Sequence, residues 1–338
     1  MRPVAEDGDL DIDLVCELTK KPYSWTQYST KKAVGDRLKS SDRYRPMLDR
    51  EGKRCWTLKY ADNKYHMDVL PCFVNEGYST ELERMLSSSS SIVTDTTAIR
   101  ITDNTRDDYY TETDSNKWLK SNPFGLAKWF YTIAFRPESL KRSIVLTEAI
   151  APVPKFYEKK STLQRVVQLM KRHRDMMFIE NGDDKPISII ITTLAARAYN
   201  DSTDLYDALR HISRNMTSYI EGTPGHRVIK NPVNPSENFA DRWSPDNNKE
   251  EYFYRWVNKL QADIDKLANI AGSGLDQMQK IFELLFGESL SKTSFKSYGK
   301  LLLEQRKNGR LTASAGAATL GTSAGATVVS HNFYGTDS

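Results

Sequence analysis

The sequence predicts an α+β protein with a mixed core at its start and a mostly helical domain after it. The chain has 338 residues, of which 39% are hydrophobic, enough to bury one large or two modest cores. Apolar and polar residues alternate with a period of two near the N-terminus, whereas from residue 122 apolar residues recur at helical spacing. We therefore expect domains over residues 1–120 and 121–310, followed by a flexible tail over residues 311–338.

The first domain is expected to contain several strands and one helix. Residues 10–14 alternate between apolar and acidic, which is typical of a strand with one buried face. Further elements are strands over residues 54–60, 64–73 and 97–102, a helix over about 24–39, a turn at 61–63 and an irregular polar stretch over 76–114.

Helices are expected to dominate the second domain. Apolar residues at helical spacing predict a helix opened by Asn122, then helices over residues 163–177, 187–199 and 253–267. Ser161 is a natural N-cap for the second of these. Residues 226–248 are too rich in proline for a helix and predict a loop. The Ala/Gly/Thr/Ser run over residues 312–330 cannot bury a core, which predicts the flexible tail.

Composition and charge narrow the class of protein. The cysteines Cys16, Cys55 and Cys72 are odd in number and lack the spacing of a disulfide framework or a zinc site, which indicates a reducing cytoplasm. The N-terminus lacks the apolar core of a signal peptide, and the longest apolar stretch, residues 187–198, is too short to cross a bilayer. The formal net charge of +4 suits a polyanion such as a nucleoside triphosphate, and we expect neither membrane nor stable DNA binding.

Three aspartates are the candidate catalytic and metal-binding residues. Asp11 and Asp13 are two apart on the first expected strand, so their carboxylates project to the same side of it. Asp68 lies in a second expected strand between Met67 and Val69, which point the other way. If the two strands are neighbours, three carboxylates converge and can share divalent cations.

Such a cluster suits nucleotidyl transfer. Two Mg²⁺ ions about 4 Å apart can activate an attacking hydroxyl and neutralise the departing pyrophosphate. Taken alone, an Asp-x-Asp pair is more common at an exposed strand edge or in a turn. Asp68 favours the metal interpretation, because an acid inside an apolar run costs free energy unless it is exposed or paired.

Several motifs then occur in a specific order. The run Asp7-Gly8-Asp9-Leu10-Asp11-Ile12-Asp13 and the run His66-Met67-Asp68-Val69-Leu70 resemble the acidic motifs of the cyclic GMP-AMP synthase-like and DncV-like nucleotidyltransferases (CD-NTases) of bacterial CBASS anti-phage systems. The resemblance continues through residues 121–126, 163–165, 171–175, 186–194, 234–235 and 237–243. It therefore covers nearly the whole chain.

The resemblance implies a polymerase-β-like nucleotidyltransferase core packed on a helical OAS-like domain, with a nucleotide cleft between them. It also implies Mg²⁺-dependent joining of ATP, with GTP or another nucleoside triphosphate, into a cyclic di- or trinucleotide that activates an effector protein during infection. By position, Asp11 and Asp13 resemble the metal pair of the family. Asp68 resembles the third acid, which helps to deprotonate the attacking hydroxyl.

One feature of the family is missing from the sequence. Family members carry a Gly-Ser motif shortly upstream of the first acidic pair, where it cradles the triphosphate. Nothing before Asp11 contains Gly followed by Ser or Thr, so we expect a core that is incomplete at its N-terminus because of a wrongly placed gene start. The alternative is a catalytically inactive nucleotide- or RNA-binding remnant, which a stop codon immediately upstream of Met1 would favour.

Lys171 is the phosphate contact that the resemblance implies, with Ser188 a weaker companion. Lys171 lies one helical turn after Val167, at the border of the apolar stripe, from which its ammonium group can reach a triphosphate. The alternative is that Lys171, Arg172 and Arg174 form only a solvated basic face.

The other conspicuous residues have simpler explanations. His66 and His173 lack metal-ligand spacing and are expected to be packed or exposed. Phe239 and Trp243 are expected to pack in the core more readily than to stack on a base. The tail resembles those that an accessory enzyme, similar to the ubiquitin-activating and ubiquitin-conjugating enzymes, joins to a partner protein; plain disorder is the alternative.

Overall fold

The chain forms two compact units in the computed structural model, which describes residues 10–60, 65–74, 78, 97–135, 160–180, 182–243, 248–270, 274–313, 320–321 and 326–328. The first unit is Met1–Val167 with Ile187–Asn247, and the second is Gln168–Pro186 with Asn248–Ser338. The units are therefore interleaved along the sequence. The expected domain boundaries at residues 120 and 310 stay a prediction.

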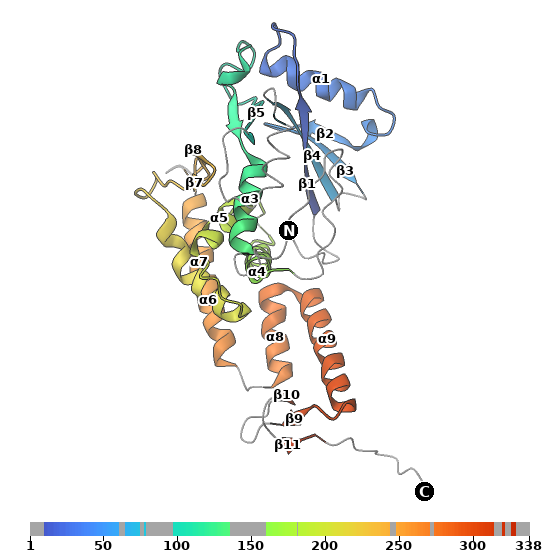
Figure 1. Cartoon of the computed structure of the whole chain (residues 1–338), viewed down its shortest axis with the longest axis vertical. Helices are drawn as coiled ribbons and strands as arrows, with labels where there is room; N and C mark the ends of the chain where they lie inside the picture. Colours follow the sequence, from blue (N-terminus) through green and yellow to red (C-terminus); the bar gives the residue numbers. More distant parts are fainter. Residues whose placement is uncertain are drawn as a thin grey trace. The chain divides into compact units, whose positions relative to one another are not determined.

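Among the described residues, a mixed six-stranded sheet organises the first unit (Figure 1). Its strands are β1 (Leu10–Leu18), β2 (Leu48–Glu51), β3 (Trp56–Tyr60), β4 (Tyr65–Phe73), β5 (Ile99–Ile101) and β6 (Leu119–Ser121). The strands β2-β3-β4-β5-β6 follow one another as antiparallel neighbours, and β1 pairs with β4 in parallel. The expected strands are confirmed, whereas the sequence pattern does not predict β2 and β6.

One face of the sheet packs against the helix α1 (Gln27–Lys39). Trp56, Leu58 and Val69 form the buried centre of this contact. The helix approaches most closely at Gly35, where an added Cβ would lie 2.3 Å from Cζ2 of Trp56. The indole N–H of Trp56 donates to the backbone oxygen of Lys31 at 2.9 Å. The missing side chain of Gly35 therefore makes room for the indole ring.

A second apolar cluster lies on the opposite face of the sheet. Cys72 and Ile99 are fully buried in it, and Phe124 from the helix α3 (Pro123–Ala134) packs against them. The helix begins where the sequence predicts, because the side chain of Asn122 accepts a hydrogen bond from the N–H of Gly125 at 2.9 Å.

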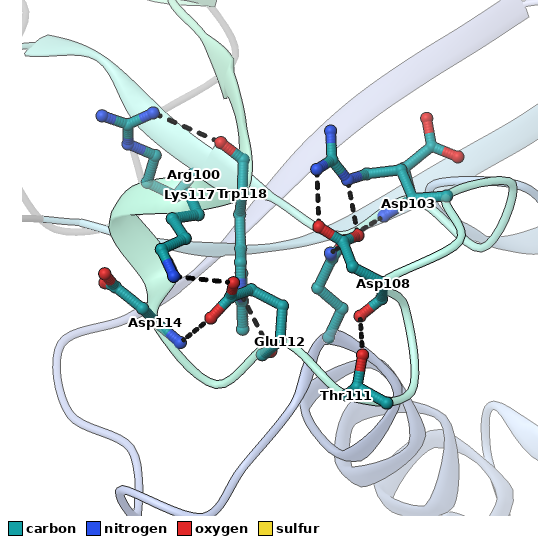
Figure 2. Close-up of polar contacts among 10 residues, drawn as sticks. Arg100, Asp103, Asp108, Thr111, Glu112, Asp114, Lys117 and Trp118 are labelled. Atoms are coloured by element: carbon teal, nitrogen blue, oxygen red, sulfur yellow. Dashed lines mark hydrogen bonds and ion pairs between the residues drawn. The ribbon is translucent and has the colours of Figure 1, made fainter.

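Side-chain contacts hold the segment between β5 and β6 (Figure 2). Arg106 pairs with Asp108 at 2.6 Å, and Lys117 pairs with Glu112 at 3.2 Å. The buried indole of Trp118 donates to the backbone oxygen of Glu112 at 3.3 Å. The sequence predicts this stretch only as an irregular edge, because its order depends on paired charges and not on a periodic pattern.

Further helices belong to the first unit. They are α5 (Ser188–Ala198), α6 (Leu205–Asn215) and the part of α4 (Thr162–Met177) up to Val167. Short 3₁₀ helices lie at Arg45–Met47, Ser115–Lys117 and Met216–Tyr219 in this unit and at Gly182–Asp184 in the second. The stretch expected as a loop contains a hairpin of β7 (Lys230–Asn231) and β8 (Asn234–Asn238). Phe239 and Trp243, which follow it, are buried, in agreement with the expected core packing.

The N-terminus of α4 has a reciprocal cap. The hydroxyl of Ser161 accepts a hydrogen bond from the N–H of Gln164 at 3.2 Å, and the side-chain oxygen of Gln164 accepts one from the N–H of Ser161 at 2.9 Å. The two bonds form a capping box. The prediction that Ser161 caps this helix is therefore confirmed.

Replacing Ser161 with alanine should lower the free energy of unfolding by about 1 kcal/mol, because the N–H of Gln164 loses its acceptor. Urea denaturation followed by circular dichroism measures the change. Ser161→Asn keeps a capping oxygen and should recover most of the loss. Equal destabilisation by the two substitutions would contradict the cap.

Helices also dominate the second unit. They are α7 (Lys249–Asn269), α8 (Leu275–Phe286) and α9 (Glu288–Lys307). The apolar stripe of α7 is buried as expected, with Phe253 and Trp256 fully enclosed. In the expected flexible tail, β9 (Thr312–Ala313) pairs with β10 (Leu320–Gly321) and β11 (Ala326–Thr327). Leu311 and Val328 are also described, and the other residues of the tail lie outside the described ranges. No helix in the described part is both long and apolar enough to span a bilayer.

Candidate active site

Two of the three candidate aspartates lie side by side on the sheet. β1 and β4 are parallel neighbours, and in their register Asp13 is aligned with Asp68, while Asp11 is aligned with His66. Neighbouring strands lie about 4.8 Å apart, and aligned residues project from the same face. The expectation that these two strands are neighbours is confirmed. Asp13 is exposed and Asp68 is half-buried; the side chain of Asp11 lies outside the described part.

Neutral hydrogen-bond donors surround the carboxylate of Asp68. Thr57 is its partner across the antiparallel β3–β4 pair, and the Thr57 hydroxyl donates to Oδ1 of Asp68 at 2.5 Å. The thiol of Cys55 also hydrogen-bonds with this carboxylate. Lys59, two residues along β3, pairs with Asp49 at 2.8 Å. Within the described ranges, no Lys or Arg side chain forms an ion pair with Asp68.

Cys55 remains a neutral thiol in this environment. Burial and, second, the negative charge of Asp68 raise the pKa of Cys55 to about 11, so the thiol is protonated at neutral pH and is a poor nucleophile. The sequence pattern alone does not indicate a role in the site for Cys55 or Thr57. Their alternation with apolar Trp56 and Leu58 is the signal that could have placed them on the polar face of β3.

The donor set of this face fits a magnesium ion. Asp13 and Asp68 offer the carboxylate oxygens that Mg²⁺ prefers, and the charge of Asp68 is not neutralised by any described Lys or Arg. The described residues contain no group of three or more His, Cys, Asp or Glu side chains that could hold a metal ion. The side chain of Asp11 is not among them, so its part in a three-carboxylate site stays a prediction.

Lys171 and Ser188 belong to different units. Lys171 lies in the part of α4 that belongs to the second unit, and its residue is 7% exposed. Ser188 is the first residue of α5 in the first unit, and its backbone oxygen accepts a hydrogen bond from the Thr192 hydroxyl at 2.8 Å. The alternative in which Lys171, Arg172 and Arg174 form a solvated face is wrong, because Lys171 and Arg174 are buried.

Other polar side chains of the same helix are engaged within the second unit. Arg174 donates to the backbone oxygen of Pro186 at 2.8 Å and to the carboxylate of Asp175 at 2.7 Å. His173 is buried and hydrogen-bonds through Nε2 to Asp263 at 3.0 Å. Burial lowers the pKa of His173, against the opposing effect of Asp263. His173 is therefore a packed residue, as expected.

Comparisons with known proteins agree with this arrangement of elements. No model of a known protein family matches the chain. The chain is 27% identical over 303 residues to a c-di-GMP synthase of Roseivirga ehrenbergii. The aligned region covers 89% of the chain and 73% of that relative. It is 22% identical over 316 residues to the cyclic dinucleotide synthase CdnG of Bradyrhizobium diazoefficiens, covering 88% of the chain and 69% of the relative.

Two solved structures show a similar fold. The CD-NTase CdnG of Bradyrhizobium diazoefficiens in complex with GTP matches with a TM-score of 0.57 and 18% identity, over 88% of this chain and 82% of that one. A variant of the Vibrio cholerae di-nucleotide cyclase DncV in complex with ATP, GTP and 5MTHFGLU2 matches with a TM-score of 0.56 and 15% identity, over 86% and 68%. The sequence relatives and the fold point to the same group of enzymes. The chain therefore resembles the CD-NTases in sequence over most of its length and in fold, which supports a nucleotidyltransferase with a polymerase-β-like core.

Proposed function

We propose that this enzyme joins nucleoside triphosphates into a cyclic di- or trinucleotide. The observation that carries the proposal is the alignment of Asp13 with Asp68 on one face of the sheet, with no described cation paired to Asp68. Two curated relatives that align with most of the chain are named as cyclic dinucleotide synthases. Structures of similar fold are complexes with GTP, or with ATP and GTP, which supports these nucleotides as substrates.

In the proposed reaction, Asp13 and Asp68 would hold Mg²⁺ together with Asp11, which lies on the same strand as Asp13. When bound, the metal supplies positive charge that acidifies the attacking hydroxyl and neutralises the departing pyrophosphate. Asp68 accepts the proton of that hydroxyl, because the Thr57 hydroxyl that hydrogen-bonds to its carboxylate carries no charge. Lys171 and Ser188 are the proposed contacts to the triphosphate.

The biological setting of the proposal rests on the family resemblance. The product is proposed to activate an effector protein in anti-phage defence, and the C-terminal tail to be joined to a partner by a ubiquitin-transfer-like enzyme. The cytoplasm is the proposed location, in keeping with the free thiols of Cys16, Cys55 and Cys72.

A product assay tests the proposed activity. The protein, expressed with any in-frame coding sequence that precedes Met1, is incubated with labelled nucleoside triphosphates and Mg²⁺, then treated with phosphatase. We expect a phosphatase-resistant product, because a cyclic oligonucleotide has no terminal phosphate, and mass spectrometry identifies its bases and ring size. A chelator should abolish the product, and excess Mg²⁺ should restore it.

The alternative, an inactive nucleotide- or RNA-binding remnant, predicts a different result in the same experiment. Labelled triphosphates would bind in a filter or calorimetric assay, but no phosphatase-resistant product would form with any combination of the four nucleotides. That outcome would overturn the proposed synthase.

A further inference from the structure

We infer that Thr57 is a positioning residue that sets the orientation of the Asp68 carboxylate for metal binding and catalysis. This inference rests on the proposed function. Thr57 lies in β3 and is the direct partner of Asp68 across the antiparallel pair, on the opposite side of β4 from Asp13. The carboxylate therefore stands between an acid on one neighbouring strand and a hydroxyl on the other.

The hydrogen bond between the two residues is short. The donor–acceptor distance from Thr57 Oγ1 to Asp68 Oδ1 is 2.5 Å, which lies in the range of a hydroxyl bound to a charged carboxylate. Directly opposed residues in an antiparallel pair hold their Cβ atoms about 5 Å apart, and a β-branched side chain such as Thr has few χ1 rotamers. The backbone thus fixes the hydroxyl, and the hydroxyl fixes Oδ1.

The neutral character of Thr57 matters as much as its geometry. A Lys or Arg in its place would also orient the carboxylate but would neutralise its charge. A hydroxyl donates one hydrogen bond to Oδ1 and leaves the negative charge of Asp68 available to a cation. Partners of metal ligands commonly act in this way, and their loss costs roughly 10- to 100-fold in metal affinity or activity.

Three variants separate this role from a purely structural one. Thr57→Val removes the hydroxyl and keeps the shape and the strand preference of the side chain. Thr57→Ser retains the hydroxyl. Thr102→Val is the matched control, because Thr102 follows β5 in the same unit and its buried hydroxyl has no hydrogen-bond partner among the described residues.

Two measurements are made on each protein: Mn²⁺ affinity by electron paramagnetic resonance, and kcat and KM for product formation. Thr57→Val should weaken Mn²⁺ binding and lower kcat by roughly 10-fold or more, with KM for nucleotide within about twofold. Thr57→Ser should recover most of both losses, and Thr102→Val should match the wild type.

The outcomes distinguish this inference from the proposed function. Absence of product from the wild type would overturn the synthase proposal, whereas the Mn²⁺ affinities would still test the positioning role of Thr57. Equal losses in Thr57→Val and Thr102→Val, or a serine variant no better than the valine variant, would overturn the positioning role. So would a valine variant with wild-type Mn²⁺ affinity and kcat.

Discussion

Asp68→Asn should reduce product formation by roughly 10³-fold while the protein stays folded. Asparagine has nearly the same shape as aspartate, and its amide oxygen can still accept the hydrogen bond of Thr57. The change removes the negative charge that is proposed to hold the metal and to take the proton of the attacking hydroxyl. The initial rate of phosphatase-resistant product, at saturating nucleotide and Mg²⁺, measures the effect.

Asp49→Asn is the matched control for this substitution. Asp49 lies in β2 of the same sheet and pairs with Lys59, and solvent screens this partly exposed pair, so its loss should hardly affect folding. The rate of Asp49→Asn should stay within about twofold of the wild type. If Asp68→Asn retains more than a tenth of the wild-type rate, Asp68 is not one of the catalytic acids.

Gly35→Ala should destabilise the first unit by about 1–3 kcal/mol, although alanine is the better helix former. An added Cβ would lie 2.3 and 2.5 Å from two carbons of the Trp56 ring, so the helix or the ring must move. The ring is held in place, because it is buried and its N–H donates to Lys31. The midpoint of urea unfolding measures the change.

A second glycine gives the opposite expectation for the same substitution. Gly299 lies within α9, and an added Cβ there has no atom within 4 Å. Gly299→Ala should therefore stabilise the helix by up to about 1 kcal/mol. Destabilisation by both alanine variants would mean that packing against Trp56 is not what makes Gly35 necessary.

The strands of the site could be predicted from the sequence, but their parallel pairing could not. Alternation identifies β1 and β4 and places Asp13 and Asp68 on polar positions of each. Pairing between strands that are distant in the sequence depends on the side chains that pack on the two faces of the sheet. The alternation within β1 or within β4 does not contain this information. β2 and β6 have four and three residues, too few to show a period. They are defined by the backbone hydrogen bonds that each forms with a neighbouring strand, β2 with β3 and β6 with β5.

The partner of Asp68 depends on the register of a single hairpin. The turn expected at residues 61–63 is centred on Asp62. In a hairpin, residues equally far from the centre of the turn face each other, so this turn would align Asp68 with Trp56. The structure aligns Asp68 with Thr57, one position further along β3. Because successive side chains point to opposite faces, that one residue decides whether an indole or a hydroxyl meets the carboxylate.

The pairing of β1 with β4 is equally sensitive to a shift of one residue in register. Acids and aliphatic residues alternate along β1, so a shift of one position would bring Ile12 or Leu14 beside Asp68 and turn Asp13 to the other surface. Insertions and deletions of single residues inside this strand should therefore inactivate the enzyme. The loops that join the strands can change in length without moving any carboxylate away from its neighbour.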